Sequence, residues 1–218
     1  MTCLPTRFTR QLLTRAVFVA CLAGLLSACV PAMMGGMVMG GLVAADRRTS
    51  GTQLEDEGIE LRAASRLREN LGERAHINVT SYNRQVLLTG EVPSLQDRQL
   101  VEQIVSRVEN VRMIVNEVGV LGQTTLSQRS SDTLVTGRVK AAFVDAKDLF
   151  SGSFKVVTER GTTYLMGRVT QREATRASDI ARGVDGVQKV VRVFEIITEE
   201  ALQEVLPKPA PVSERNSR

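Results

Sequence analysis

The sequence predicts an α+β fold made of two copies of one small unit, and two observations carry this prediction. Segments of the 218-residue chain match each other at a separation of 76 or 77 residues. Each segment also alternates helix-like and strand-like hydrophobic patterns in the same order. Self-similarity at a fixed spacing is typical of a repeated structural unit. We therefore expect two units of the order helix–strand–strand–helix–strand, each with a small three-stranded mixed sheet packed on two helices.

Each unit is expected to begin with a helix, over residues 59–71 in the first copy and 133–144 in the second. Asp132 stands where an N-cap would, because its carboxylate can accept a helix N–H. The acidic run at 55–57 is expected at a helix start, where the helix dipole favours it, with a metal site as the weaker alternative. A second helix is expected across 100–108 and 174–184, and a third strand over 112–120 and 189–197.

The paired strands carry the clearest repeat. Residues 86–92 (VLLTGEV) correspond to residues 163–169 (TYLMGRV). Apolar and polar residues alternate along the first of these segments, which is typical of a half-buried strand. Gly90 and Gly167 take the same strand position, and a glycine there usually permits a close approach of two backbones. We expect a packing role for both glycines and expect the two units to pack against each other.

The N-terminus is expected to be a lipoprotein signal peptide. Three Arg and no acid precede the apolar run at residues 16–28, which is too short to span a bilayer comfortably. The run ends in Leu-Ser-Ala directly before Cys29, and this ending resembles a bacterial lipobox. That resemblance implies that Cys29 carries the lipid and, with Val30 after it, that the protein is sorted to the outer membrane. An ordinary signal peptide with a chance cysteine is the alternative.

The repeated unit, with its VLLTGEV and TYLMGRV runs, resembles the BON domain. Two such units behind a lipobox resemble the dual-BON outer-membrane lipoproteins. The resemblance implies that the chain has no enzyme activity and that its second domain binds anionic phospholipid. The expected organisation is a signal peptide over 1–28, the acylated Cys29 and a flexible tether over 29–45, BON domain 1 over 46–121, a linker over 122–130, BON domain 2 over 131–198 and a disordered tail over 199–218.

The charge distribution agrees with lipid binding by the second domain. Residues 46–121 carry ten Arg and twelve Asp or Glu, whereas residues 129–198 carry twelve basic and eight acidic residues. Each basic residue near an anionic bilayer contributes about 1 kcal/mol of attraction. Phosphatidylglycerol and cardiolipin are therefore the expected partners, and an ordinary solvated surface is the alternative. Residues 29–218 are nearly neutral, with 25 basic and 24 acidic residues, which argues against nucleic acid as a partner.

The first helix of the second unit is the candidate lipid-contact element. Its core stripe includes Val139 and Phe143, so Leu134 is an apolar residue left over beside cationic neighbours. Apolar insertion combined with head-group attraction is typical of an interfacial helix. The loop at 149–152 offers further apolar surface, and packing of Leu134 on domain 1 is the alternative. The phospholipid-binding candidates are Leu134, Val135, Arg138, Lys140, Ala141 and Val144.

The sequence contains few histidine or cysteine residues that could act as nucleophiles or metal ligands. Cys3 and Cys21 lie in the expected signal peptide, and Cys29 is the expected lipid site. His76 has no second His or Cys at metal-ligand spacing and is expected to be a surface or turn residue. We therefore expect no catalytic residue, no cofactor and no metal site.

The function expected from these observations is non-enzymatic. A periplasm-facing outer-membrane lipoprotein would bind anionic phospholipid and support envelope integrity, with roles in cell division and the stress response implied by the resemblance. The alternative is a periplasmic protein–protein adaptor for outer-membrane assembly or cell-wall remodelling at division.

Overall fold

A computed structural model describes residues 46–205 of the chain. The described residues lie within one compact unit, and residues 59–193 supply the buried members of its three hydrophobic clusters. Among the described residues, no helix combines the length and the apolar character needed to cross a bilayer. The signal peptide, Cys29 and the tether expected from the sequence lie outside the described residues.

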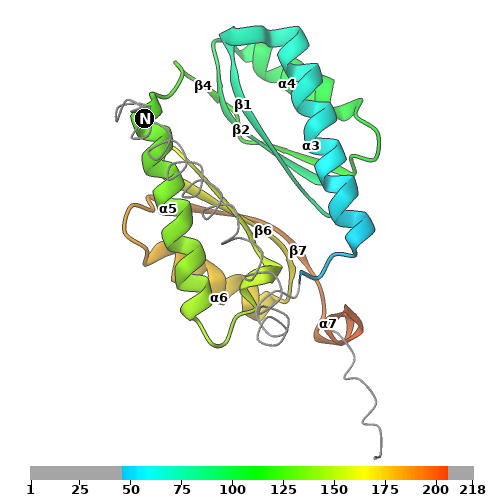
Figure 1. The fold of residues 1–218 in the computed structure, drawn as a ribbon, viewed down its shortest axis with the longest axis vertical. Coiled ribbons are helices and arrows are strands. Elements are labelled where there is room, and N and C mark those ends of the chain that lie inside the picture. Colours follow the sequence, from blue (N-terminus) through cyan, green and yellow to red (C-terminus); the bar gives the residue numbers. More distant parts are fainter. Residues whose placement is uncertain (1–45, 206–218) are drawn as a thin grey trace, which may run out of the picture. The chain divides into compact units, whose positions relative to one another are not determined.

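The first repeat has the expected order, with its third strand broken in two. Strands β1 and β2 are antiparallel, and β3 and β4 both run parallel to β2. Figure 1 shows α3 and α4 together on one face of this sheet. The elements are α3 (Ser50–Leu71), η2 (Gly72–Arg74), β1 (His76–Tyr82), β2 (Gln85–Val92), α4 (Leu95–Ser106), β3 (Met113–Asn116) and β4 (Gly119–Val120).

The second repeat has the same topology with an unbroken third strand. Strand β6 pairs antiparallel with β5 and parallel with β7, and α5 and α6 cover one face of this sheet (Figure 1). The expected fold of two αββαβ units is confirmed. The elements are α5 (Leu126–Asp145), η3 (Ser151–Ser153), β5 (Lys155–Glu159), β6 (Thr162–Val169), α6 (Gln171–Arg182), β7 (Lys189–Ile196) and a further helix α7 (Glu199–Val205).

Each repeat has its own hydrophobic core between its helices and its sheet. In the first repeat the core includes Ile59 of α3 and Leu88 of β2, both fully buried. In the second repeat Phe143 of α5 packs edge-on against Phe154, with ring centroids 5.1 Å apart. The strand residues of these cores alternate with residues that face the other side of the sheet, as the period of two requires.

The other faces of the two sheets meet in a third cluster. Tyr82 and Leu87 from the first sheet pack with Tyr164, Met166 and Val193 from the second. Burial raises the pKa of both tyrosines to about 12. The two units therefore pack against each other, as the sequence led us to expect.

Both first helices begin earlier than the sequence pattern suggested. Thr49 caps α3 by accepting from the N–H of Thr52, and Thr125 caps α5 by accepting from the N–H of Gln128. The prediction that Asp132 is an N-cap is therefore wrong, because Asp132 lies inside α5. The helix start expected at 55–57 is wrong for the same reason.

Asp56 and Asp132 instead brace the hairpin turn of their own repeat. Asp56 accepts from the backbone N–H groups of Asn83 and Arg84, both at 2.7 Å. Asp132 accepts in the same way from Arg160 and Gly161, at 2.9 and 3.0 Å. Burial opposes ionisation of Asp56, but hydrogen bonds, led by the one from Ser81, outweigh it and hold its pKa below the usual range.

The strand glycines have the packing role that the sequence suggested. Gly90 has a φ of +110°, and a Cβ there would collide with the carbonyl oxygen of His76 on the paired strand. A Cβ on Gly167 would collide with the carbonyl oxygen of Ser153. Gly90 lets the two hairpin strands approach more closely than a side chain allows, and Gly167 does the same for β6 and the 3-10 helix η3 before β5.

The expected disordered tail is wrong for its first seven residues. Residues 199–205 form helix α7, and Leu202 is buried at 5% exposure. Burial of an apolar side chain stabilises this short helix, which alone would be too short to persist in water. The rest of the tail lies outside the described residues.

Candidate functional site

Helix α5 presents an exposed face on the side opposite its buried stripe. Val139 and Phe143 are buried in the core, whereas Leu134 and Val144 are 63% and 59% exposed. At 100° per residue, the exposed candidates span an arc of about 160°, with Arg138 and Lys140 at its edges and the apolar residues between them. The exposed Asp145 in the last turn of α5 lies within the same arc. We name this surface the α5 outer face; it consists of Leu134, Arg138, Lys140, Ala141 and Val144, all exposed.

Two expectations about this region are wrong. Val135 is 4% exposed and belongs to the core, so it cannot be a lipid-contact residue. Leu149 is also buried, which leaves Phe150 as the exposed apolar residue of the following loop. Leu134 could have packed on the first domain, but its exposure places it in solvent. The α5 outer face therefore retains five of the six candidates.

Arg138 remains accessible on this face. Its guanidinium donates to the carbonyl oxygen of Asp185 at 3.3 Å and lies 3.8 Å from the carboxylate of the same residue. Both side chains are exposed, and exposed pairs at such distances contribute little because water screens them. An anionic head group can therefore compete for Arg138.

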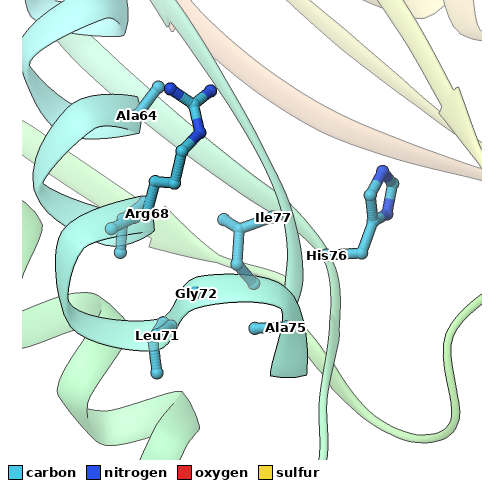
Figure 2. A pocket seen from close by; sticks show the side chains of 8 residues that line it. Ala64, Arg68, Leu71, Gly72, Ala75, His76 and Ile77 are labelled. Atoms are coloured by element: carbon cyan, nitrogen blue, oxygen red, sulfur yellow. The ribbon is translucent and has the colours of Figure 1, made fainter.

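The pocket in Figure 2 offers no acid–base machinery. It has a volume of about 160 Å³ and lies between the end of α3 and the start of β1. Arg68 and His76 are the titratable residues lining it. Figure 2 shows that the His76 ring points away from α3, on the opposite side of β1 from Ile77. A reaction by general acid and base needs two groups that converge on one point, and these two do not.

His76 is not the lone turn residue that the sequence suggested. It begins β1, and the hairpin register places it opposite Glu91 of β2. Its Nδ1 lies 3.4 Å from a carboxylate oxygen of Glu91, which is fully buried. Glu159 at the end of β5 joins this pair, and the ligand atoms of all three residues lie within 4.8 Å of one another.

The pairing of His76 with Glu91 could be predicted from the sequence. The two-residue turn Asn83–Arg84, with φ of 51° and 66°, fixes the hairpin register and hence the partner of His76. Glu159 belongs to the other repeat, so no local pattern brings it to His76. Burial raises the pKa of Glu159, and the charge of Glu91 raises it further, against the opposing hydrogen bond from Asn78.

Comparison with known proteins gives two kinds of match. A profile of the BON domain matches residues 55–122 and 131–198. The outer membrane lipoprotein DolP of Haemophilus influenzae is 36% identical over 175 residues, which cover 79% of this chain and 90% of that protein. A 21 kDa hemolysin of Actinobacillus pleuropneumoniae is 33% identical over 154 residues, covering 70% of this chain and 79% of the relative.

A solved structure gives a weaker likeness. The C-terminal domain of CdsD, a structural protein of the type III secretion system of Chlamydia trachomatis, is 10% identical to this chain. The match covers 62% of this chain and 96% of that one, with a TM-score of 0.27. At this level the likeness indicates neither fold nor function.

Proposed function

This chain belongs to the BON-domain family, and from that premise we propose that it is a non-enzymatic outer-membrane lipoprotein that binds anionic phospholipid. The similarity to the outer membrane lipoprotein DolP supports the envelope location. In this proposal Cys29 carries the lipid anchor and the folded part faces the periplasm. The α5 outer face then contacts phosphatidylglycerol or cardiolipin and supports envelope integrity.

The observation that carries the proposal is the composition of the α5 outer face. Leu134 and Val144 leave most of their apolar surface in water. Burying one such side chain completely is worth about 1.5–3 kcal/mol. Arg138 and Lys140 flank the apolar residues, and each cation adds about 1 kcal/mol near an anionic surface. The face therefore combines shallow insertion with head-group attraction.

The anchor and the helix contribute different things. Acyl chains bury many CH₂ groups, each worth about 0.8 kcal/mol, and hold the protein at the bilayer. The α5 outer face binds lipid more weakly than the acyl chains do, and in the anchored protein it meets the lipid at a high effective concentration. In this proposal the anchor keeps the protein at the membrane, and the α5 outer face makes the protein prefer anionic lipids.

Vesicle co-sedimentation of residues 46–218 tests the proposal, because this fragment lacks the anchor. Wild type is expected to sediment with phosphatidylglycerol vesicles and not with phosphatidylcholine vesicles, and sedimentation should fade as salt rises. The double variant Leu134→Glu/Arg138→Glu should lose binding, since it reverses one charge and inserts another into the apolar arc.

A matched control separates this site from a general charge effect. Leu61 of α3 is 73% exposed, and Arg68 lies on the same side of that helix, two turns on. The double variant Leu61→Glu/Arg68→Glu changes the net charge by the same amount and should keep binding. Equal loss in both variants, or no sedimentation of wild type with either vesicle, would overturn the proposal.

One observation favours the adaptor alternative. A groove of about 480 Å³ runs beside β1, lined by α3 residues that include Glu57 and Leu61. Strand β1 pairs with β2 alone among the described strands, so one of its edges has no strand partner. Edge strands and neighbouring apolar grooves are used to bind extended peptides. If wild type ignores both vesicles, this groove becomes the leading candidate.

A further inference from the structure

We propose that His76, Glu91 and Glu159 form a binding site for Zn²⁺ that joins the two repeats. His76 and Glu91 come from the first hairpin, and Glu159 ends the first strand of the second repeat. One metal ion would therefore hold strands of both units. This inference does not depend on the proposed lipid binding.

The geometry fits a metal better than a hydrogen bond. The Nδ1 atom of His76 lies 3.4 Å from Oε2 of Glu91, beyond the usual range of about 2.7–3.2 Å for an N–H···O bond. This Nδ1 is buried and makes no hydrogen bond within the part of the chain that the structure describes. Two ligands at about 2.0–2.1 Å from a tetrahedral zinc ion are separated by roughly 3.4 Å, which matches this distance.

The donor set selects for a transition metal. One imidazole nitrogen and two carboxylate oxygens leave a fourth tetrahedral position for water, as in zinc sites with three protein ligands. Magnesium and calcium prefer oxygen ligands alone, so an imidazole disfavours both. Zinc is therefore the ion that the residues fit best.

The groups around Glu91 hold its carboxylate in place. Oε1 accepts from Nε of Arg160 at 2.7 Å. Oε2 lies toward His76 and accepts long hydrogen bonds from the N–H and the hydroxyl of Thr124, at 3.4 and 3.5 Å. A charged partner of this kind orients a ligating carboxylate. The surrounding charged side chains also include Arg129 and Asp132, which line an adjoining hollow with His76 and Glu159. Three carboxylates against two guanidinium groups leave the neighbourhood negative, which favours a cation.

The ion has a route to the site. The adjoining hollow has a volume of about 220 Å³ and opens to solvent. The His76 side chain is 22% exposed, whereas Glu91 is fully buried. An ion can therefore approach from the side of His76 and Glu159 and reach Oε2 of Glu91 last, while water completes its coordination from the hollow.

Zinc titration calorimetry at pH 7.5 tests the site. The full chain is purified in non-ionic detergent with a tag that lacks histidine, and free thiols are alkylated because thiolates bind zinc. Wild type is expected to bind one equivalent of ZnCl₂. His76→Ala and Glu159→Gln should each weaken binding at least tenfold, whereas Glu69→Gln, which removes an exposed acid of α3, should leave it unchanged. MgCl₂ and CaCl₂ should not compete.

NMR spectroscopy of the wild-type protein provides a second test of the zinc site. His76 is the one histidine of the chain, so its imidazole resonances in an NMR spectrum report on this site alone. One equivalent of ZnCl₂ should shift these resonances, and a chelator should restore them. Unmoved resonances would overturn the proposal, as would zinc binding that persists unchanged in His76→Ala.

Discussion

The buried ion pair between Arg47 and Glu173 should be among the most sensitive contacts of the fold. Arg47 precedes α3, and Glu173 lies in the first turn of α6, so the pair links the two repeats. Nη2 of Arg47 lies 2.6 Å from Oε1 of Glu173, and Nη1 lies 2.8 Å from Oε2. Both side chains are only 1% exposed. Replacement of Arg47 by Met keeps an unbranched apolar stem of similar length to the aliphatic part of Arg and removes the charged guanidinium.

The expected cost follows from the carboxylate that stays behind. Removing one partner of a buried pair leaves an uncompensated charge and costs about 3–5 kcal/mol. For a domain of this size, each kcal/mol lowers Tm by about 2–4 °C, so a fall of roughly 6–20 °C is expected. Burial alone raises the pKa of Glu173, and the hydrogen bond from Arg47 reverses this to a lowered value.

The lowered pKa of Glu173 also predicts how the stability of the protein depends on pH. A carboxyl with a lowered pKa contributes stability above its unfolded pKa of about 4.3, and this contribution is lost as pH falls through the folded value. Without Arg47 the carboxyl is easier to protonate, and protonation relieves the penalty. The difference in stability between wild type and Arg47→Met should therefore shrink as pH falls from 7 to 4.

Urea unfolding of residues 46–218, followed by circular dichroism, measures both effects. Arg112→Met is the control, because its pair with Glu195 also links the repeats but Arg112 is 53% exposed. An exposed pair should contribute less than about 1 kcal/mol. The double variant Arg47→Met/Glu173→Gln should cost less than the sum of its single changes. A cost below about 1 kcal/mol for Arg47→Met would refute the argument.

Unfolding measurements on four further variants test other parts of the fold. Gly137→Ala should stabilise the fold by about 0.5–1 kcal/mol, because Gly137 lies inside α5 and a Cβ there meets open space; a fall in Tm would contradict this. Gly90→Ala should destabilise by more than about 2 kcal/mol, since backbone strain adds to the collision with the paired strand. Gly72→Ala, whose φ is also positive but whose surroundings are open, should cost clearly less than Gly90→Ala, and equal costs would refute the collision. The lowered pKa of Asp56 predicts stability that is complete well above pH 4 and is lost on further acidification; Asp56→Asn should flatten this acid dependence of the urea midpoint, and an unchanged slope would refute the assignment.

Local sequence patterns were enough to predict most of the fold. The duplication, the strand at 86–92 and the turns at 83–84 and 160–161 could all be read in short windows, because side-chain period and turn chemistry act over a few residues. The half-buried character expected of this strand is wrong, because the second sheet covers its other face and seven of the eight residues of β2 are buried. The prediction of two BON units is confirmed. The expectation of an exposed α5 face agrees with the structure for the same reason, since helical periodicity separates Leu134 from the buried stripe.

The predicted helix starts were wrong where an aspartate could serve either as an N-cap or as a hydrogen-bond acceptor for a hairpin turn. An aspartate before an apolar stripe is chemically suited to be an N-cap, and Asp132 has that place in the sequence. The tertiary structure uses its carboxylate for two turn N–H groups of the hairpin instead. The threonines Thr49 and Thr125 then take the caps, further upstream.

The contacts that join the repeats depend on the tertiary structure alone. Glu159 reaches His76, and Glu173 reaches Arg47, only because two sheets pack face to face and bring distant segments together. Packing of this kind is set by the shapes of both surfaces, and no periodicity within one segment encodes it. The sequence therefore established the units and their exposed and buried faces, and the packing of the two units decided which charged side chains meet.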